Sequence, residues 1–129
     1  MARRKQVTVP IANLPGTLAG ITEALGKAGV NVEAFTVFEG QAHLLVDKDK
    51  AAVEALREAR YPCLESEVLF LDIDHRPGAL ALAARALSAA GVNIDYAYSG
   101  SGPAPGRAFI VMSVSDLGKA EKAVERRAV

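Results

Sequence analysis

One stretch occurs twice in this chain and decides its fold: NLPGTLAGITEALGKAGVNVEAFTV at residues 13–37 and HRPGALALAARALSAAGVNIDYAYS at residues 75–99. The copies align without a gap at an offset of 62 residues, the distance in sequence from Asn13 to His75. A chance similarity does not hold one register over so many positions, so the chain is built from two copies of one unit. The identical residues are Pro15, Gly16, Leu18, Ala19, Ala24, Leu25, Ala28, Gly29, Val30 and Asn31, each of which recurs 62 positions later.

Each copy predicts the same local elements around this stretch. β-rich segments at residues 6–11 and 67–73 lead into a Pro-Gly pair, which is typical of a turn into the first residues of a helix. Apolar residues spaced three and four apart predict one buried helix face, and Gly29 and Gly91 suit the left-handed conformation that ends a helix. The predicted buried stripes are Leu18, Ile21, Leu25 and Ala28 in the first copy and Leu80, Ala83, Leu87 and Ala90 in the second.

A hairpin and a second helix follow in each copy. The first hairpin turns tightly at Glu39 and Gly40, whereas the second has a longer loop. The second helices begin near Asp49 and Asp116, each of which suits an N-cap. The hairpin strands are predicted at residues 30–38 and 41–46 in the first copy, and at residues 92–99 and 107–113 in the second.

The order strand, helix, strand, strand, helix, strand is the ferredoxin-like βαββαβ plan. A strand near residues 61–66 closes the first copy, whereas the second copy stops at Val129, where its own last strand is due. We therefore predict an α+β fold of two repeats, at residues 1–66 and 67–129, with helices on one face of antiparallel sheets. The sheet of the second repeat is short of its last strand, or something else completes it.

Composition and charge argue against several classes of function. Fifteen Lys and Arg balance fifteen Asp and Glu, Trp is absent and aromatic residues make up only 5%, so the sequence offers no overall positive field and few stacking residues for nucleic acid. No apolar run reaches the roughly 20 residues of a membrane helix, and the N-terminus lacks the apolar core of a signal peptide. We expect a cytoplasmic protein with no nucleic-acid or membrane partner, in which Arg3, Arg4 and Lys5 form a solvated terminus.

Two short motifs recur at the same spacing in both copies. They are Asn13-Leu14-Pro15-Gly16 with Gly29-Val30-Asn31-Val32, and His75-Arg76-Pro77-Gly78 with Gly91-Val92-Asn93-Ile94. In this arrangement the chain resembles the ACT domain family. The resemblance implies a non-catalytic regulatory module without a cofactor, which binds a free amino acid or a similar small metabolite. It also implies a dimer, or a tandem pair that mimics one, and an enzyme or regulator as the partner that is controlled.

The resemblance also implies which residues bind the ligand. In amino-acid-binding relatives, the polar residue two before the proline and the Asn after the helix contact the ligand, and the Pro-Gly corner of one unit faces the post-helix strand of its neighbour. Ile11 and Ile73 replace a further polar residue of the family pattern, which speaks against serine-like specificity. One expected pocket is made by Asn13, Leu14, Gly16, Asn93 and Ile94, and the other by Asp74, His75, Arg76, Gly78, Asn31 and Val32.

The chemistry of the repeated residues leaves alternatives open. Gly16 and Gly78 either let a ligand approach the backbone closely or only turn the corner. Asn31 and Asn93 either bind the carboxylate or amine of a ligand or hydrogen-bond local backbone.

Charged and aromatic residues of the second copy suggest a more polar pocket there. Asp72 and Asp74 alternate on a strand, so their side chains should point to one side, where they could recognise an ammonium group. Together with Arg76 they should make this the tighter pocket for a zwitterion. His75 stands where the first copy has Asn13, which favours a hydrogen-bonding role.

His43, in the first copy, has no metal-ligand set near it and is predicted to be a surface or hydrogen-bonded histidine.

Sequence signatures of enzymes are missing. The Gly-rich stretch at residues 100–106 lacks the Lys-Ser/Thr of a P-loop, and there is no nucleophile elbow, H-E-x-x-H or C-x-x-C motif. We therefore expect no catalytic and no metal-binding residues. Two other functions stay open: an assembly or interaction protein with vestigial pockets, favoured by an unpaired sheet edge, and a small hydrolase on the same fold.

Overall fold

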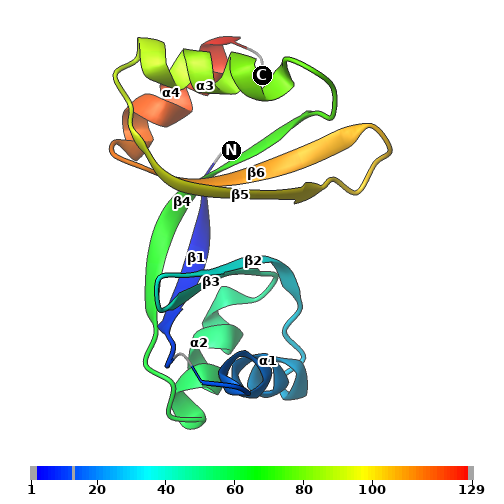
Figure 1. The fold of residues 1–129 in the computed structure, drawn as a ribbon, viewed down its shortest axis with the longest axis vertical. Coiled ribbons are helices and arrows are strands. Elements are labelled where there is room, and N and C mark those ends of the chain that lie inside the picture. Colours follow the sequence, from blue (N-terminus) through cyan, green and yellow to red (C-terminus); the bar gives the residue numbers. More distant parts are fainter. Residues whose placement is uncertain (1–2, 13, 128–129) are drawn as a thin grey trace. The chain divides into compact units, whose positions relative to one another are not determined.

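The computed structural model describes residues 3–12 and 14–127, in which helices and strands alternate as the repeat predicts (Figure 1). The elements are β1 (Arg3–Pro10), α1 (Thr17–Lys27), β2 (Val32–Phe38), β3 (Gln41–Val46), α2 (Asp49–Glu58), β4 (Leu64–Asp74), α3 (Ala79–Ala89), β5 (Ile94–Ser101), β6 (Arg107–Val114) and α4 (Leu117–Arg127). The predicted ferredoxin-like α+β fold is confirmed. Within these residues α4 is the last element.

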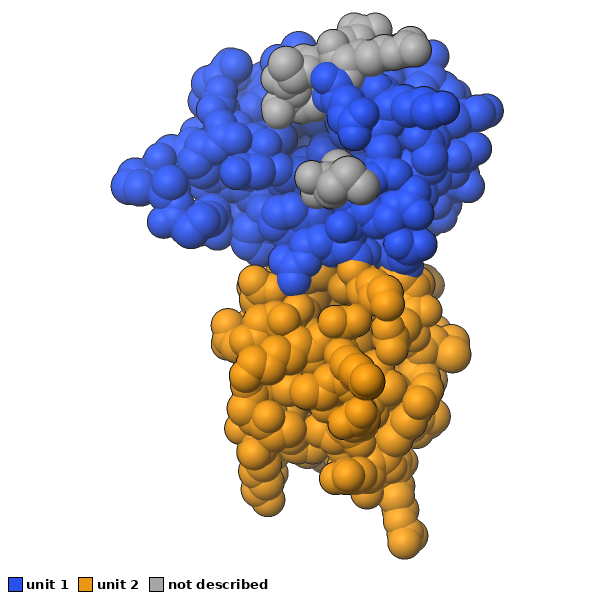
Figure 2. All heavy atoms as spheres, turned by 180° about the vertical axis from the view of Figure 1, so that it is seen from behind, with its two compact units in different colours: residues 1–4, 67–129 blue, residues 5–66 orange. Residues whose placement is uncertain are grey.

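The chain forms two compact units, which Figure 2 distinguishes by colour. We name residues 1–4 and 67–129 unit 1 and residues 5–66 unit 2. The division into repeats at residues 1–66 and 67–129 stays a prediction.

Unit 2 packs two helices against its strands. β3 pairs antiparallel with β2 and with β1, so that Leu44 lies opposite both Phe35 and Val7. The hairpin turns at Glu39 (φ 49°) and Gly40 (φ 75°), the two positive φ angles that the tight type I′ turn requires. Its buried core is built from β1, α1, β3 and α2 and includes Val7, Val9, Ile21, Leu25, Leu44, Val53 and Leu56.

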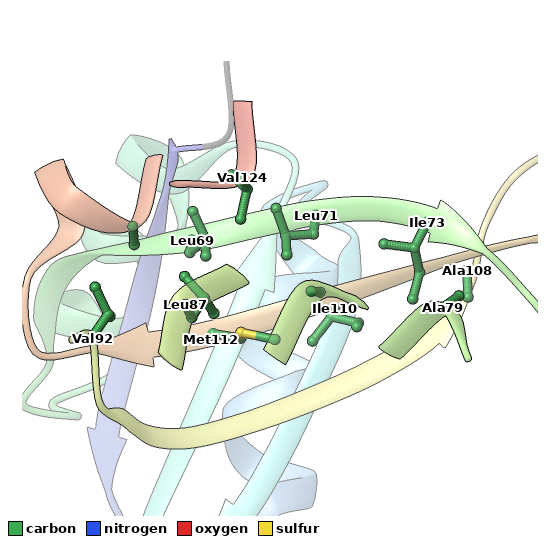
Figure 3. Close-up of a cluster of buried hydrophobic side chains, with 12 residues drawn as sticks. Leu69, Leu71, Ile73, Ala79, Leu87, Val92, Ala108, Ile110, Met112 and Val124 are labelled. Atoms are coloured by element: carbon green, nitrogen blue, oxygen red, sulfur yellow. The ribbon is translucent and has the colours of Figure 1, made fainter. Parts of the chain in front are cut away.

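Unit 1 repeats this arrangement. β6 pairs antiparallel with β4 and β5, so that Ile110 lies opposite both Leu71 and Ser99. Figure 3 shows how the buried side chains of these strands meet those of the helices. The core includes Leu69, Leu71, Ile73, Ala83, Leu87, Ile110, Met112 and Val124.

The start of β1 completes the sheet of unit 1. In the strand order β2-β3-β1-β4-β6-β5, β1 occupies the place beside β4 where the closing strand of the second repeat belongs. Arg3 pairs with Glu67 and donates from its Nε to Oε1 of Glu121 at 3.1 Å, while the Arg4 guanidinium lies 5.3 Å from the centre of the Phe70 ring. The expectation that Arg3 and Arg4 form a solvated terminus is therefore wrong, because the unfinished sheet gives them a partner strand.

The helix predictions hold with local corrections. The stripe residues in the middle of the helices, Ile21, Leu25, Ala83 and Leu87, are buried as predicted. Ala28 and Leu80 are exposed, because Ala28 lies just past the end of α1 and Leu80 lies outside the buried face of α3, which Ala79, Ala83, Ala86 and Leu87 form. No described helix is long and apolar enough to span a membrane.

The two proposed N-caps have different outcomes. The carboxylate of Asp116 accepts a hydrogen bond from the Lys119 amide at 3.0 Å and caps α4 as predicted. Asp49 is instead the first residue within α2, and Lys48 is the N-cap. The N-cap prediction for Asp49 is therefore wrong.

Candidate ligand-binding site

The two Pro-Gly corners have the same geometry, and this confirms that both lead into helices. Gly16 and Gly78 are the N-caps of α1 and α3, with φ angles of 88° and 87°. A Cβ built at either position would meet no heavy atom within 4 Å, so the described structure needs glycine there for its left-handed backbone and not for space. Neither cap provides a side-chain acceptor for the first-turn amides of its helix. These amides therefore retain the partial positive charge of a helix N-terminus.

The Asn residue after each helix is held through its backbone. The Asn31 amide donates to the Asp47 carboxylate at 2.9 Å, and the Asn93 amide donates to the Ser115 hydroxyl at the same distance. Each Asn carbonyl in turn accepts from the amide of that partner residue. Both Asn residues are exposed, and the Asn93 side chain donates to Asp95 at 3.0 Å. These contacts give the Asn positions a structural role, and a role in ligand binding stays a prediction.

A cavity of about 600 Å³ opens in unit 1 beside its Pro-Gly corner. The corner contributes Asp74, His75 and Arg76, and β5 contributes Ile94. The structure thus brings four of the predicted site residues together within one unit. The other lining residues are Ile73, Ala79, Leu80, Ala84, Ala97, Tyr98, Ser99, Ala108, Ile110 and Met112.

The remaining predicted site residues lie elsewhere. Asn93 lines a smaller hollow of about 440 Å³, which shares Ile94 and Ala84 with the first cavity. Leu14, Gly16, Asn31 and Val32 belong to unit 2, and Asn13 lies outside the described residues. The expected sharing of each pocket between the two repeats stays a prediction.

Ion pairs hold Asp74, which lines the cavity together with Arg76. Arg107 donates to the Asp72 carboxylate at 3.1 Å and also pairs with Asp74, whose other carboxylate oxygen accepts from Arg76 Nε at 3.2 Å. The hydrogen bond from Arg76, together with the hydrogen bond and charge of Arg107, lowers the pKa of Asp74 below its ordinary value of 3.8. Asp72 and Asp74 therefore share one side as predicted, but arginines already pair with both carboxylates. Two acids and two bases leave this cluster without net charge.

Burial controls two other titratable side chains. Desolvation raises the pKa of the Tyr98 hydroxyl far above its ordinary value. Tyr98 alternates with Ala97 and Ser99 along β5, so its side chain points to the other face of the sheet. His43 is 8% exposed, and its Nδ1 lies 3.0 Å from the Thr8 hydroxyl and 3.4 Å from Gln6 Nε2. Burial also lowers the pKa of His43. Of the two predicted alternatives, the contacts with Thr8 and Gln6 confirm the hydrogen-bonded histidine, and the burial of His43 contradicts the surface one. No cluster of three or more potential metal ligands occurs among the described residues.

The two repeats differ at the positions that shape this cavity. Ala97 and Ser99 of β5 correspond, 62 positions earlier, to Phe35 and Val37 of β2. Sequence reasoning missed Ala97, Ser99 and Arg107. The alignment of the two repeats contained a signal for Ala97 and Ser99, because it matches these small residues of the second copy with the larger Phe35 and Val37 of the first.

Comparison with known proteins decides the family. The family model described as an ACT domain pair matches residues 2–125. The chain belongs to this ACT domain pair family. This confirms the resemblance to ACT domains that the motifs indicated. No protein with a curated description matches the sequence.

Solved structures show the same fold over almost the whole chain. The crystal structure of protein BT0572 from Bacteroides thetaiotaomicron has 28% sequence identity and a TM-score of 0.92, with 99% of this chain and 90% of that chain covered. The ligand-free regulatory subunit of aspartate kinase from Thermus thermophilus has 19% identity and a TM-score of 0.68, with 98% and 91% covered. E. coli aspartokinase III, in complex with lysine and aspartate, has 16% identity and a TM-score of 0.62, with 97% of this chain but only 30% of that chain covered.

Proposed function

We propose that this ACT domain pair is a non-catalytic regulatory module that binds a free amino acid, with the corner of unit 1 holding the ligand's charged groups. The observation that carries the proposal is the Arg76–Asp74 ion pair at the edge of an otherwise mostly apolar cavity. Its two groups have the opposite charges that a zwitterion needs: a guanidinium for the carboxylate and a carboxylate for the ammonium. The uncapped N-terminus of α3 adds further positive potential for the carboxylate.

The Arg76–Asp74 ion pair can separate for a ligand at a small cost in free energy. The Arg76 and Asp74 side chains are 57% and 49% exposed, and exposed ion pairs contribute little to stability. The carboxylate of a bound amino acid can therefore replace Asp74 as the partner of Arg76, and its ammonium group can replace Arg76 as the partner of Asp74. Asp74 also keeps its contact with Arg107, which holds the carboxylate in place during that exchange.

The structural neighbours support a regulatory role for such binding. Two of them are a regulatory subunit of aspartate kinase and an aspartokinase in complex with lysine and aspartate. By analogy, the partner of this chain is an enzyme or regulator whose activity follows the concentration of the amino acid. The placement of the ligand between the two repeats, which the family resemblance implies, is the alternative location.

Calorimetric titration of the purified chain with the common free amino acids tests the proposal. At least one amino acid should bind, and Arg76→Gln should weaken that binding about tenfold or more, because a hydrogen bond to a charged group is lost. Arg85→Gln is the matched control, since Arg85 is exposed on α3 and does not line the cavity. If no amino acid binds, or if both variants bind like the unaltered chain, the proposed site is wrong.

A second proposal, self-association, is favoured by apolar residues on β2, which is an edge strand. Phe35, Val37 and Phe38 are 55%, 42% and 63% exposed, although a monomer gains nothing from leaving such side chains in water. A homodimer is the simplest assembly that covers them. Light scattering should report a dimer that Phe35→Ser weakens and Leu82→Ser, at an exposed position of α3, does not. A monomer at high concentration would contradict this proposal.

A further inference from the structure

We infer that the cavity of unit 1 selects amino acids with apolar side chains, and that Ala97 and Ser99 set the size it accepts. This inference rests on the proposed binding of an amino acid at the corner of unit 1. It adds the class of ligand and the residues that determine specificity.

The walls of the cavity are unsuited to a charged ligand side chain. Beyond the corner, the cavity is lined by aliphatic and thioether groups, among them Ile94, Ile110 and Met112. The Ser99 hydroxyl is the polar side-chain group that β5 presents to this lining. A charged side chain buried there would need an ionic partner. The nearby acids Asp72 and Asp74 are already balanced by Arg107 and Arg76.

The strand register places Ala97 and Ser99 on the face of the sheet that lines the cavity. Ala97 lies opposite Met112, and Ser99 lies opposite Ile110, and both partners contribute to the buried core under α3. A larger residue at either position would enter the space available to the ligand. Cavity size in this unit therefore depends on two small side chains.

The first repeat provides larger residues that are already tolerated at the same register. Phe35 lies opposite Leu44, and Val37 lies opposite Ala42, which are the equivalents of the Ala97 and Ser99 pairings. Ala97→Phe and Ser99→Val thus copy the first repeat into the second. Both variants should fold, because their backbone positions accept these side chains in unit 2.

The charged residues of the Pro-Gly corner also occur only in the second repeat. Asp74 and Arg76 correspond to Ala12 and Leu14, so the equivalent corner of unit 2 lacks both charged groups. An amino acid with an apolar side chain therefore matches unit 1 in two places: its charged groups match the corner, and its side chain matches the apolar cavity. This asymmetry predicts one strong binding event per chain from the corner and cavity of unit 1.

Calorimetry with leucine, methionine, phenylalanine, alanine, lysine and aspartate tests the inference on the full chain. The best apolar amino acid should bind about tenfold or more tightly than lysine or aspartate, because apolar side-chain burial provides the difference. Ala97→Phe should weaken the binding of that amino acid about tenfold, and Ser99→Val should weaken it by a smaller factor. Alanine, which needs only the corner, should bind both variants as it binds the unaltered chain. Ala81→Phe adds the same ring at an exposed position outside the cavity and should change nothing.

The outcomes separate this inference from the function on which it rests. Binding of lysine or aspartate as tightly as leucine would overturn the selectivity while amino-acid binding stands. Unchanged leucine binding in both Ala97→Phe and Ser99→Val, with loss of binding in Arg76→Gln, would show that the side chain does not enter this cavity. Failure of every amino acid to bind the unaltered chain would overturn the proposed function itself. Circular dichroism melts of each variant verify that the protein tested is folded.

Discussion

Gly20 and Tyr61 form a contact whose energetic effect can be predicted from the structure. Gly20 lies inside α1, and a Cβ placed on it would lie 2.3 Å from the Tyr61 hydroxyl oxygen but 3.5 Å from the ring carbon that carries it. Gly20→Ala should gain about 1 kcal/mol of helix propensity. It must also displace the hydroxyl, and overpacking costs about 1 to 3 kcal/mol. The variant should therefore be as stable as the unaltered protein or less stable by up to about 2 kcal/mol.

Removing the hydroxyl should reverse the sign of this effect. In a Tyr61→Phe background the nearest contact of the new Cβ is the ring carbon at 3.5 Å, an ordinary van der Waals distance. Gly20→Ala should then stabilise the protein by about 1 kcal/mol, so the coupling energy of the double-mutant cycle is about 1 to 3 kcal/mol.

Urea unfolding followed by circular dichroism measures all four members of the cycle. Gly26→Ala is the control, because a Cβ at this other α1 glycine meets nothing within 4 Å. It should stabilise both backgrounds by about 0.5 to 1 kcal/mol. If Gly20→Ala has the same effect with and without the hydroxyl, then Tyr61 does not pack on α1 as described.

Three further changes test other parts of the structure. Arg3→Ala should lower the melting temperature in a salt-dependent way, because it removes the ion pair with Glu121. Lys5→Ala should lower it less, because the contact of Lys5 with Glu65 is longer, at 3.9 Å. Equal effects of the two variants would refute the role of Arg3. Gly16→Ala should destabilise the protein by about 1 kcal/mol in urea unfolding, since its left-handed backbone penalises a Cβ; no loss would refute the positive φ. Stability should fall with decreasing pH below about 6.5, because burial lowers the folded-state pKa of His43 and the unfolded chain therefore binds the proton more readily. His43→Phe should flatten this dependence in pH-dependent melts, and an unchanged slope would assign it to other groups.

The sequence predicts the backbone of this protein well because the decisive signals are local. Pro-Gly pairs, the apolar spacing of helices and the glycines after them each act within a few residues, and the repeat tests every assignment twice. The tight turn at Glu39 and Gly40 is local in the same sense, since two positive φ angles are a property of adjacent residues. Errors occurred where neighbours in space decide, as at Leu80, which stays exposed at the first turn of its helix.

The chemistry of the candidate site depends on register, which local patterns do not specify. Asp72 and Asp74 look available for an ammonium group in the sequence. Their pairing with Arg107 follows from the alignment of β4 with β6, where Asp74 lies opposite that residue. In sequence, α3, β5 and the loop after β5 separate Asp74 from Arg107, so spacing alone could not predict this contact. The completion of unit 1 by Arg3 escaped prediction for the same reason, since it joins residues 118 positions apart in sequence.

The repeats therefore conserve what the backbone needs and differ in what a ligand would touch. Both copies keep the corner glycines, because another residue would strain the left-handed N-cap, and both keep the Asn that ties the helix end to the next strand. In contrast, the charged corner residues Asp74 and Arg76 and the small Ala97 have Ala12, Leu14 and Phe35 as their counterparts. None of these differences changes the course of the chain, so the fold places no constraint on them. An internal repeat thus distinguishes two kinds of residue within a single sequence. Positions that agree between the copies support the fold, and positions that disagree and gather around one cavity mark the unit that we propose to bind the ligand.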